Sequence, residues 1–156
     1  MSAIETKLAE LGVTLPDVGA APKAAGNYLP YVTVGDMVYV SGQISQDENG
    51  PVKGVLGADF TLEQGAAAAK LCAISLLTQA KIACDGDMGR LVRVVKLTGF
   101  VNSTPDFVDQ PRVINGASDF LVDALGEKGR HARSAVSAAS LPFGVAVEIE
   151  GIFEIA

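Results

Sequence analysis

The sequence predicts a single α+β domain over residues 1–156, in which two long helices cover one face of a mixed β-sheet. Three observations support this class. The chain has 156 residues, enough for one complete hydrophobic core and too few for two ordinary domains. Hydrophobic residues make up 49% of it, and their spacing is helical in some segments and strand-like in others. The expected order is helix, two or three strands, long helix, strand, long helix and two strands, which fits helices segregated to one side of a sheet.

The first third is expected to form a short helix and a hairpin. Apolar residues recur at i, i+4 and i+7 among charged residues in 1–12, which predicts an amphipathic N-terminal helical extension. Residues 28–41 are rich in β-branched and aromatic side chains interrupted by Gly35-Asp36, which predicts two strands joined by a tight turn. Residues 52–56 are expected to add a short strand.

The two long helices flank a buried strand. Ala, Leu, Lys and Gln dominate residues 61–84, and Thr61 followed by Gln64 has the pattern of a capping box, so this segment predicts a long helix. Residues 91–101 form a near-continuous apolar run typical of a strand. A second helix, started or broken by prolines, is expected over 105–126.

The last third returns to strands. We expect strands over 134–141 and 145–155, joined by a turn at 142–144. Apolar residues occupy every second position of the closing strand, so Glu148 and Glu150 lie together on the opposite face. They are roughly 6.6 Å apart along that face, close enough for partial desolvation to raise the pKa of one of them.

One face of this sheet is predicted to need a cover that the chain cannot supply. Residues 134–140 are almost all Ser, Ala and Val, which makes a smooth surface suited to close packing on another sheet. Charged residues make up only 19% of the chain, against about 25% in typical globular proteins. We therefore expect a second subunit to cover the open face.

Charge and patterning exclude several function classes. The net charge is −6, so nucleic acid and anionic membranes are not expected partners. Charged residues interrupt the N-terminal segment where a secretory signal would need an apolar core, which predicts a cytoplasmic protein. No run approaches the ~20 apolar residues of a membrane span, because lysines interrupt even the Ala-rich segment 66–83.

Cysteine and histidine spacing predicts neither a disulfide nor a metal site. Cys72 and Cys84 lie 12 positions apart on one predicted helix, or about 18 Å at ~1.5 Å per residue. A disulfide tolerates only ~7 Å between Cα atoms. Two thiols and a single histidine without paired spacing make no zinc site, so no metal is expected.

Familiar catalytic motifs are missing, which leaves two candidate places. There is no Walker loop, dinucleotide fingerprint or nucleophile elbow, and the lone His131 has no obvious acid partner for a Ser-His-Asp triad. The cluster 129–133 presents Arg133, which suits a carboxylate ligand; the alternative is a solvated charge or a structural ion pair. Glu148 and Glu150 suit acid-base work; the alternative is a wet sheet face.

A set of short segments between residues 26 and 154 carries a family resemblance. These segments are Gly26-Asn27-Tyr28, Val40-Ser41-Gly42-Gln43, Val101, Asn115, Ala132-Arg133-Ser134-Ala135-Val136, Leu141-Pro142 and Val147-Glu148-Ile149-Glu150. In combination they resemble the reactive-intermediate deaminase family, called RidA or YjgF-like and formerly endoribonuclease L-PSP. The combination is specific, whereas any one piece would be weak.

The resemblance implies a fold, an assembly and an activity. It implies a chorismate-mutase-like subunit in a homotrimer, with sheets lining a central barrel and three active sites in clefts between neighbours. That assembly agrees with the uncovered sheet face. Family members hydrolyse enamine and imine acids such as 2-aminoacrylate, released by pyridoxal-phosphate enzymes, to 2-keto acids and ammonia. The implied protein needs no cofactor.

The resemblance also implies residue roles. Arg133 matches the arginine that holds the substrate carboxylate, and Glu148 matches the glutamate that positions or activates the attacking water. Three further positions match residues in or near the family's pocket: Tyr28, Ser41 and Asn115. The usual cysteine two residues after the arginine is Ala135 here, whose backbone groups are left to line the site. The longer N-terminal helix and the longer segment near 105–111 resemble a longer subgroup.

Two alternatives to a deaminase remain open on the sequence. One is a binding module that holds a small carboxylate or a partner protein in the same cleft without turnover. The other is the ribonuclease activity suggested by the older family name. The acidic balance, the lone histidine and the missing basic, aromatic-lined track argue against it.

Overall fold

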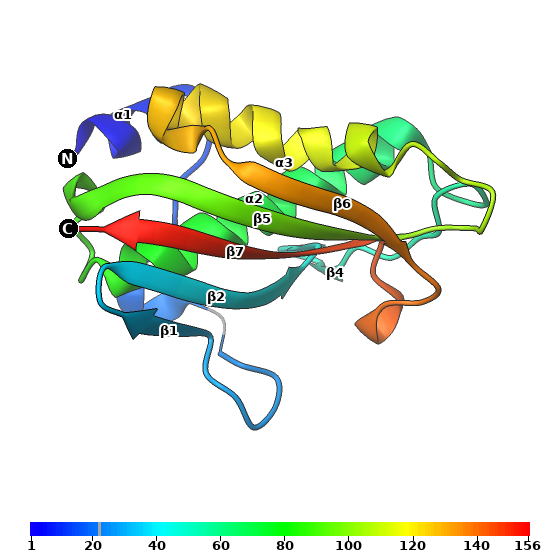
Figure 1. Cartoon of the computed structure of the whole chain (residues 1–156), viewed down its shortest axis with the longest axis horizontal. Helices are drawn as coiled ribbons and strands as arrows, with labels where there is room; N and C mark the ends of the chain where they lie inside the picture. Colours follow the sequence, from blue (N-terminus) through cyan, green and yellow to red (C-terminus); the bar gives the residue numbers. More distant parts are fainter. Residues whose placement is uncertain (22) are drawn as a thin grey trace.

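The computed structural model describes residues 1–21 and 23–156, which form one five-stranded sheet, a two-stranded ribbon and three α-helices (Figure 1). The helices are α1 (Ala3–Glu10), α2 (Leu62–Ala83) and α3 (Gln110–Leu125). The sheet strands are β1 (Tyr31–Val34), β2 (Met37–Ile44), β5 (Leu91–Asn102), β6 (Ala132–Ala138) and β7 (Val147–Ile155), and the ribbon strands are β3 (Gln46–Asp47) and β4 (Gly50–Pro51). Short 3₁₀ turns are η1 (Val18–Ala20), η2 (Met88–Arg90), η3 (Gly126–Gly129) and η4 (Pro142–Gly144).

The sheet is mixed, with the strand order β1-β2-β7-β5-β6. β5 and β6 are parallel because α3 carries the chain between them, and the other neighbouring pairs are antiparallel. The predicted hairpin is confirmed: Val34 pairs with Met37, and Gly35 adopts the positive φ of 60° that this tight turn requires. The expected α+β class with two long helices on one sheet face is therefore correct.

Side-chain caps mark the beginnings of α1 and α2. The Thr61 side chain accepts a hydrogen bond from the Gln64 amide and the Gln64 side chain caps Thr61 in return, which confirms the capping box of α2. Ser2 and Glu5 cap α1 in the same way. A Cβ added to Gly116 on α3 would collide with the Ala66 carbonyl of α2, so only glycine allows this close crossing of the two long helices.

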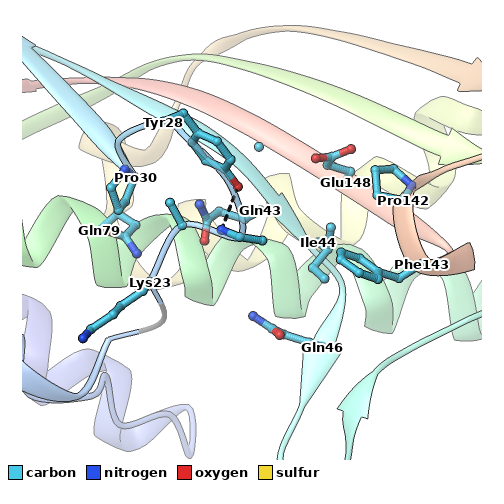
Figure 2. A pocket seen from close by; sticks show the side chains of 13 residues that line it. Lys23, Tyr28, Pro30, Gln43, Ile44, Gln46, Gln79, Pro142, Phe143 and Glu148 are labelled. Carbon is cyan, nitrogen blue, oxygen red and sulfur yellow. Dashed lines mark hydrogen bonds between the residues drawn. The ribbon is translucent and has the colours of Figure 1, made fainter.

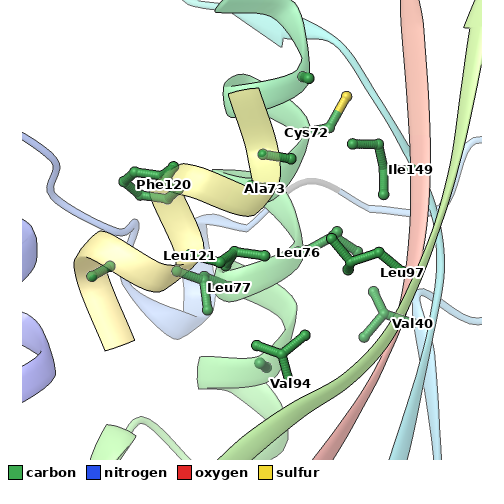
Figure 3. Packing of buried hydrophobic residues seen from close by; sticks show 14 of the residues in the cluster. Val40, Cys72, Ala73, Leu76, Leu77, Val94, Leu97, Phe120, Leu121 and Ile149 are labelled. Atoms are coloured by element: carbon green, nitrogen blue, oxygen red, sulfur yellow. The ribbon is translucent and has the colours of Figure 1, made fainter. Parts of the chain in front are cut away.

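The core lies between α2 and α3 on one side and the sheet on the other (Figure 3). Leu76 of α2 lies beside Leu97 of β5, and Leu77 of α2 lies beside Leu121 of α3; all four side chains are fully buried. Because central strands bury the most side-chain area, their alternation fixes which face the helices cover.

The opposite sheet face is open in the chain. Strand pairing aligns one row across it: Val32, Tyr39, Ile152, Lys96 and Ala132. Several large apolar side chains on this face are 44–62% exposed: Val32, Val34, Tyr39 and Val136. The predicted glutamate face of β7 belongs to it, because Ile149 and Phe153 point into the core while Glu148 and Glu150 alternate with them.

By length and composition α2 could cross a membrane, which corrects the expectation that no segment could. Half of the apolar stretch of α2 is buried inside the fold, where α2 packs against the sheet and α3. This burial makes α2 the core helix of the domain.

Three predicted boundaries are wrong. Residues 52–56 form no strand, because Lys53 and Leu56 make only isolated bridges and the ribbon β3-β4 precedes them. The second long helix starts at Gln110 rather than 105, with proline in its first turn where the missing amide costs least. β6 covers 132–138 rather than 134–141, since its pairing follows β5 from Lys96 to Asn102.

Candidate functional site

Glu148 lies in a cavity of about 370 Å³ on the open side of the sheet (Figure 2). The walls come from the segment before β1, the end of β2, β3, α2, β7 and the η4 turn. Lining residues include Tyr28, Gly42, Ile44, Pro142, Phe143 and Glu148. Figure 2 shows Tyr28 at one side of the cavity, and Pro142 and Phe143 beside Glu148 at the other. The cavity thus combines one carboxylate with aromatic and apolar side chains, three glutamine amides and Lys23.

A bulge in β2 makes room for the carboxylate. The register against β7 shifts between Val40 and Gln43, so Gly42 lies in the bulge while Ile44 pairs with Glu148. A Cβ added to Gly42 would lie 2.5 Å from Glu148 Oε1. Ser41, in the same bulge, donates from Oγ to the Leu29 carbonyl at 2.7 Å. Its hydroxyl therefore fastens the bulge to the segment that carries Tyr28.

The environment of Glu148 favours its protonated form. Burial raises the pKa of Glu148 above its ordinary value, and the nearby Glu150 carboxylate adds to the effect. Among the described residues no Lys, Arg or His nitrogen lies within 4.0 Å of the Glu148 carboxylate to offset this. A carboxylate with a raised pKa is a better proton acceptor near neutral pH than an ordinary glutamate.

Tyr28 forms the mouth of the same cavity. Its ring is 52% exposed, and its hydroxyl oxygen accepts a hydrogen bond from the Ala25 amide at 3.3 Å. The phenol O–H stays available to donate toward the cavity. A side chain this exposed is not part of the packed core.

Arg133 lies in a second cavity, of about 310 Å³, between β6 and α3. The lining residues are Asn115, Ser118, Asp119, Val122, Arg130, His131 and Arg133. The guanidinium donates from Nη1 to Ser118 Oγ and from Nη2 to the Pro111 carbonyl, both at 3.0 Å. In the described part of the chain no carboxylate lies within 4.0 Å of it. The structural ion-pair alternative is therefore wrong for Arg133, which is fixed in place without a counter-charge.

The single chain separates the expected site residues into two groups. Arg133 pairs with the core residue Leu97 and points to the helix side of the sheet, while Glu148 points to the open side. Tyr28 accompanies Glu148, and Asn115 accompanies Arg133. Ala135 pairs with Gly99 and packs against the core, outside both cavities.

The structure adds residues that sequence reasoning missed. Ser118 and His131 share the Arg133 cavity, and Gly42 and Phe143 shape the Glu148 cavity. Signals for two of them were present, since Ser118 is three positions after Asn115 on α3 and a His two positions before an Arg on a strand shares its face. Gly42 and the positive φ of 60° at Phe143 depend on a bulge and a turn that carry no such periodicity.

His131 bonds to Ser118 and to the backbone. Its Nε2 lies 2.9 Å from Ser118 Oγ and its Nδ1 lies 2.6 Å from the Gly129 carbonyl. The third member is thus a carbonyl where a Ser-His-Asp triad has a carboxylate, in keeping with the missing acid partner in the sequence.

Fold and cavities together define a small α+β protein of the chorismate-mutase-like class. A family model described as "YjgF/chorismate mutase-like, putative endoribonuclease" matches residues 5–150. The chain belongs to this family, as the resemblance of its short segments implied.

Three relatives show how close the match is. Protein TCP17 of Trypanosoma cruzi is 46% identical over 97% of this chain and 94% of its own length. The crystal structure of Atu1372 from Agrobacterium tumefaciens, a protein with unknown function, is 48% identical over 99% of this chain and 93% of that one, with a TM-score of 0.89. RidA from the Antarctic bacterium Psychrobacter sp. PAMC 21119 is 29% identical over 92% and 99%, with a TM-score of 0.58.

Proposed function

We propose that the protein is an imine and enamine deaminase whose active site forms where two subunits meet. Arg133 of one subunit holds the substrate carboxylate, and Glu148 of its neighbour positions the water. The observation that carries the proposal is the division of charge in one chain: an ordered guanidinium without a carboxylate partner lies on one side of the sheet, and a partly buried carboxylate lies on the other. Each is half of a site that a second copy completes.

The geometry around Arg133 suits a carboxylate ligand. A guanidinium has five N–H donors, and the bonds to Ser118 and Pro111 occupy two of them. Three donors are left, enough for a bidentate pair with the carboxylate of a 2-imino acid. Asn115, exposed on α3 in the same cavity, adds an amide that can bond the substrate nitrogen or carboxylate.

The reaction requires little more than a held water and a proton acceptor. Protonation of an enamine at carbon, or of an imine at nitrogen, gives the same iminium ion, whose carbon is electrophilic. Glu148 accepts a proton from the water as its oxygen adds to that carbon. Glu148 returns this proton to the nitrogen of the resulting carbinolamine, and ammonia leaves as the C–N bond breaks. The hydroxyl proton passes back to Glu148 as the C=O bond of the 2-keto acid forms. A raised pKa brings Glu148 toward neutral pH, where transfer in both directions is efficient.

The open sheet face supports a homotrimer as the working form. Its exposed valines and Tyr39 form an apolar surface that a neighbour's sheet can cover. A cytoplasmic location and the absence of nucleic-acid or membrane partners accord with the net charge of −6 and form part of the proposal.

The first experiment measures ammonia and keto-acid release from imines that an amino-acid oxidase generates in situ. Wild type is expected to accelerate release, and both Arg133→Ala and Glu148→Gln are expected to abolish most of it. Turnover retained by Arg133→Ala would contradict the proposed mechanism. Tight binding of a 2-keto acid without any turnover would instead identify a carboxylate-binding module.

Mixing the two inactive variants tests whether the site is shared. In trimers assembled at random from equal amounts of Arg133→Ala and Glu148→Gln chains, about one quarter of the sites contain both intact residues if they come from different subunits. Activity should therefore return to about one quarter of the wild-type value after co-refolding. A site built within one chain would regain none.

A further inference from the structure

Four groups in the Arg133 cavity form a continuous hydrogen-bonded chain. It runs from the Gly129 carbonyl to His131 Nδ1 at 2.6 Å, from His131 Nε2 to Ser118 Oγ at 2.9 Å, and from Ser118 Oγ to Arg133 Nη1 at 3.0 Å. The proposed reaction assigns no role to His131 or Ser118.

When the His131 ring is neutral, donor and acceptor rules fix the direction of every bond in this chain. A carbonyl oxygen only accepts, so His131 Nδ1 carries the hydrogen that it donates to Gly129. In the neutral ring Nε2 is then a bare acceptor, and the Ser118 hydroxyl donates to it. Arg133 has only donors, so Ser118 Oγ accepts from Nη1. Every donor in this chain therefore faces an acceptor.

We infer that His131 and Ser118 are positioning residues that hold the Arg133 guanidinium in the plane in which it receives a carboxylate. This inference rests on the proposed role of Arg133. An arginine side chain is long and flexible, and a bidentate pair requires its planar fork to face the ligand. Ser118 on Nη1 and the Pro111 carbonyl on Nη2 fasten the fork at two points on α3. His131 in turn directs the Ser118 hydroxyl hydrogen away from the guanidinium.

The arrangement follows from the two elements that form the cavity. Ser118 lies on α3 three residues after Asn115, and His131 directly precedes β6, two residues before Arg133. A helix repeat of three and a strand repeat of two therefore place all four side chains in one cavity. Both positioning residues are partly buried, so solvent does not readily replace them.

Kinetics of matched variants test the inference. Ser118→Ala and His131→Ala should raise KM for the imine by about tenfold, because a hydrogen bond to a charged group contributes an effect of that order. Their kcat should change by less than about twofold, as expected when ground-state and transition-state binding weaken together. The affinity for pyruvate, the keto acid that 2-aminoacrylate would yield, should fall by the same factor as KM rises.

Two conservative variants separate positioning from a merely structural role. His131→Gln places an amide oxygen near the Nε2 position and should restore most of the lost affinity, whereas His131→Asn reaches only the Nδ1 position and should not. Ser118→Thr keeps the hydroxyl and should rescue Ser118→Ala. If Ser118→Ala does not assemble, the Gln and Asn variants of His131 carry the test.

The single histidine of the chain gives a second readout. Long-range ¹H–¹⁵N spectra at about pH 9, above the range in which histidines ordinarily titrate, report one ring without ambiguity. We expect the Nδ1–H tautomer in wild type and in Arg133→Lys, and a larger Nε2–H fraction in Ser118→Ala. An Nε2–H ring in wild type would overturn the inference.

The outcomes distinguish this inference from the proposed function. A normal KM in Arg133→Ala would remove the role of Arg133 and with it the proposed function. A raised KM in Arg133→Ala together with wild-type values in Ser118→Ala and His131→Ala would overturn the positioning role alone.

Discussion

Replacing Gly42 by alanine should impair catalysis without unfolding the protein. The added Cβ would lie 2.5 Å from Glu148 Oε1, 3.1 Å from Cδ and 3.3 Å from Cγ, whereas ordinary contacts begin at 3.4 Å. The carboxylate must therefore move by about 1 Å, and a misplacement of that size costs about a hundredfold in rate. The clash meets the end of a flexible side chain rather than backbone, so the free energy of unfolding should change by less than about 1 kcal/mol.

The assay compares kcat for imine hydrolysis with thermal unfolding of the same preparation. Gly19→Ala is the matched control, because no atom lies within 4 Å of its added Cβ and it should leave both kcat and Tm unchanged. A Gly42→Ala protein with wild-type kcat would show that the position of the Glu148 carboxylate does not matter to the reaction. A large loss of Tm would show that the bulge, rather than the carboxylate, depends on glycine.

Three further predictions follow from burial and packing. Burial raises the pKa of Glu148, so at pH values above the ordinary glutamate pKa the native state binds more protons than the unfolded chain. The contribution of Glu148 to stability therefore falls as the pH rises from its unfolded pKa through its folded pKa. Glu148→Gln should accordingly raise Tm more at about pH 7 than at about pH 4. Gly116→Ala drives a Cβ into the Ala66 carbonyl and should lower Tm by about 5 °C or more, as measured by calorimetry against Gly19→Ala. Cys72 and Cys84 are free and buried, and burial raises the pKa of both thiols, so a thiol reagent should modify them only after denaturant is added; rapid labelling of the native protein would contradict this packing.

Sequence reasoning succeeded where a repeat and a cap reinforce each other. The α2 helix has both its capping box and its apolar composition, and its observed bounds, Leu62–Ala83, follow the prediction closely. The alternation of β7 likewise predicted which side chains face the core. Sequence reasoning failed at residues 52–56, where a short apolar run makes isolated bridges instead of a ladder. Such a run has no period of its own, so long-range pairing decides its structure.

The residues of the candidate site could be predicted from the sequence, but their positions relative to one another could not. The family resemblance selected Arg133, Glu148, Tyr28 and Asn115, and each of these lines one of the two cavities. That Arg133 and Glu148 occupy opposite sides of the sheet needs the register of three strands, β6, β5 and β7. Local periodicity assigns a face within one strand and does not relate two strands to each other.

Strand alternation gives the division of the site a physical cause. Strand pairing aligns Leu97 with Arg133 and Phe100 with both Glu148 and Val136. An odd-numbered β6 residue therefore points to the helices and an even-numbered β7 residue points away from them. No rotamer carries a side chain through a hydrogen-bonded sheet, so within one chain the two groups cannot meet over a single substrate. Under the proposed mechanism, catalysis consequently requires a second subunit.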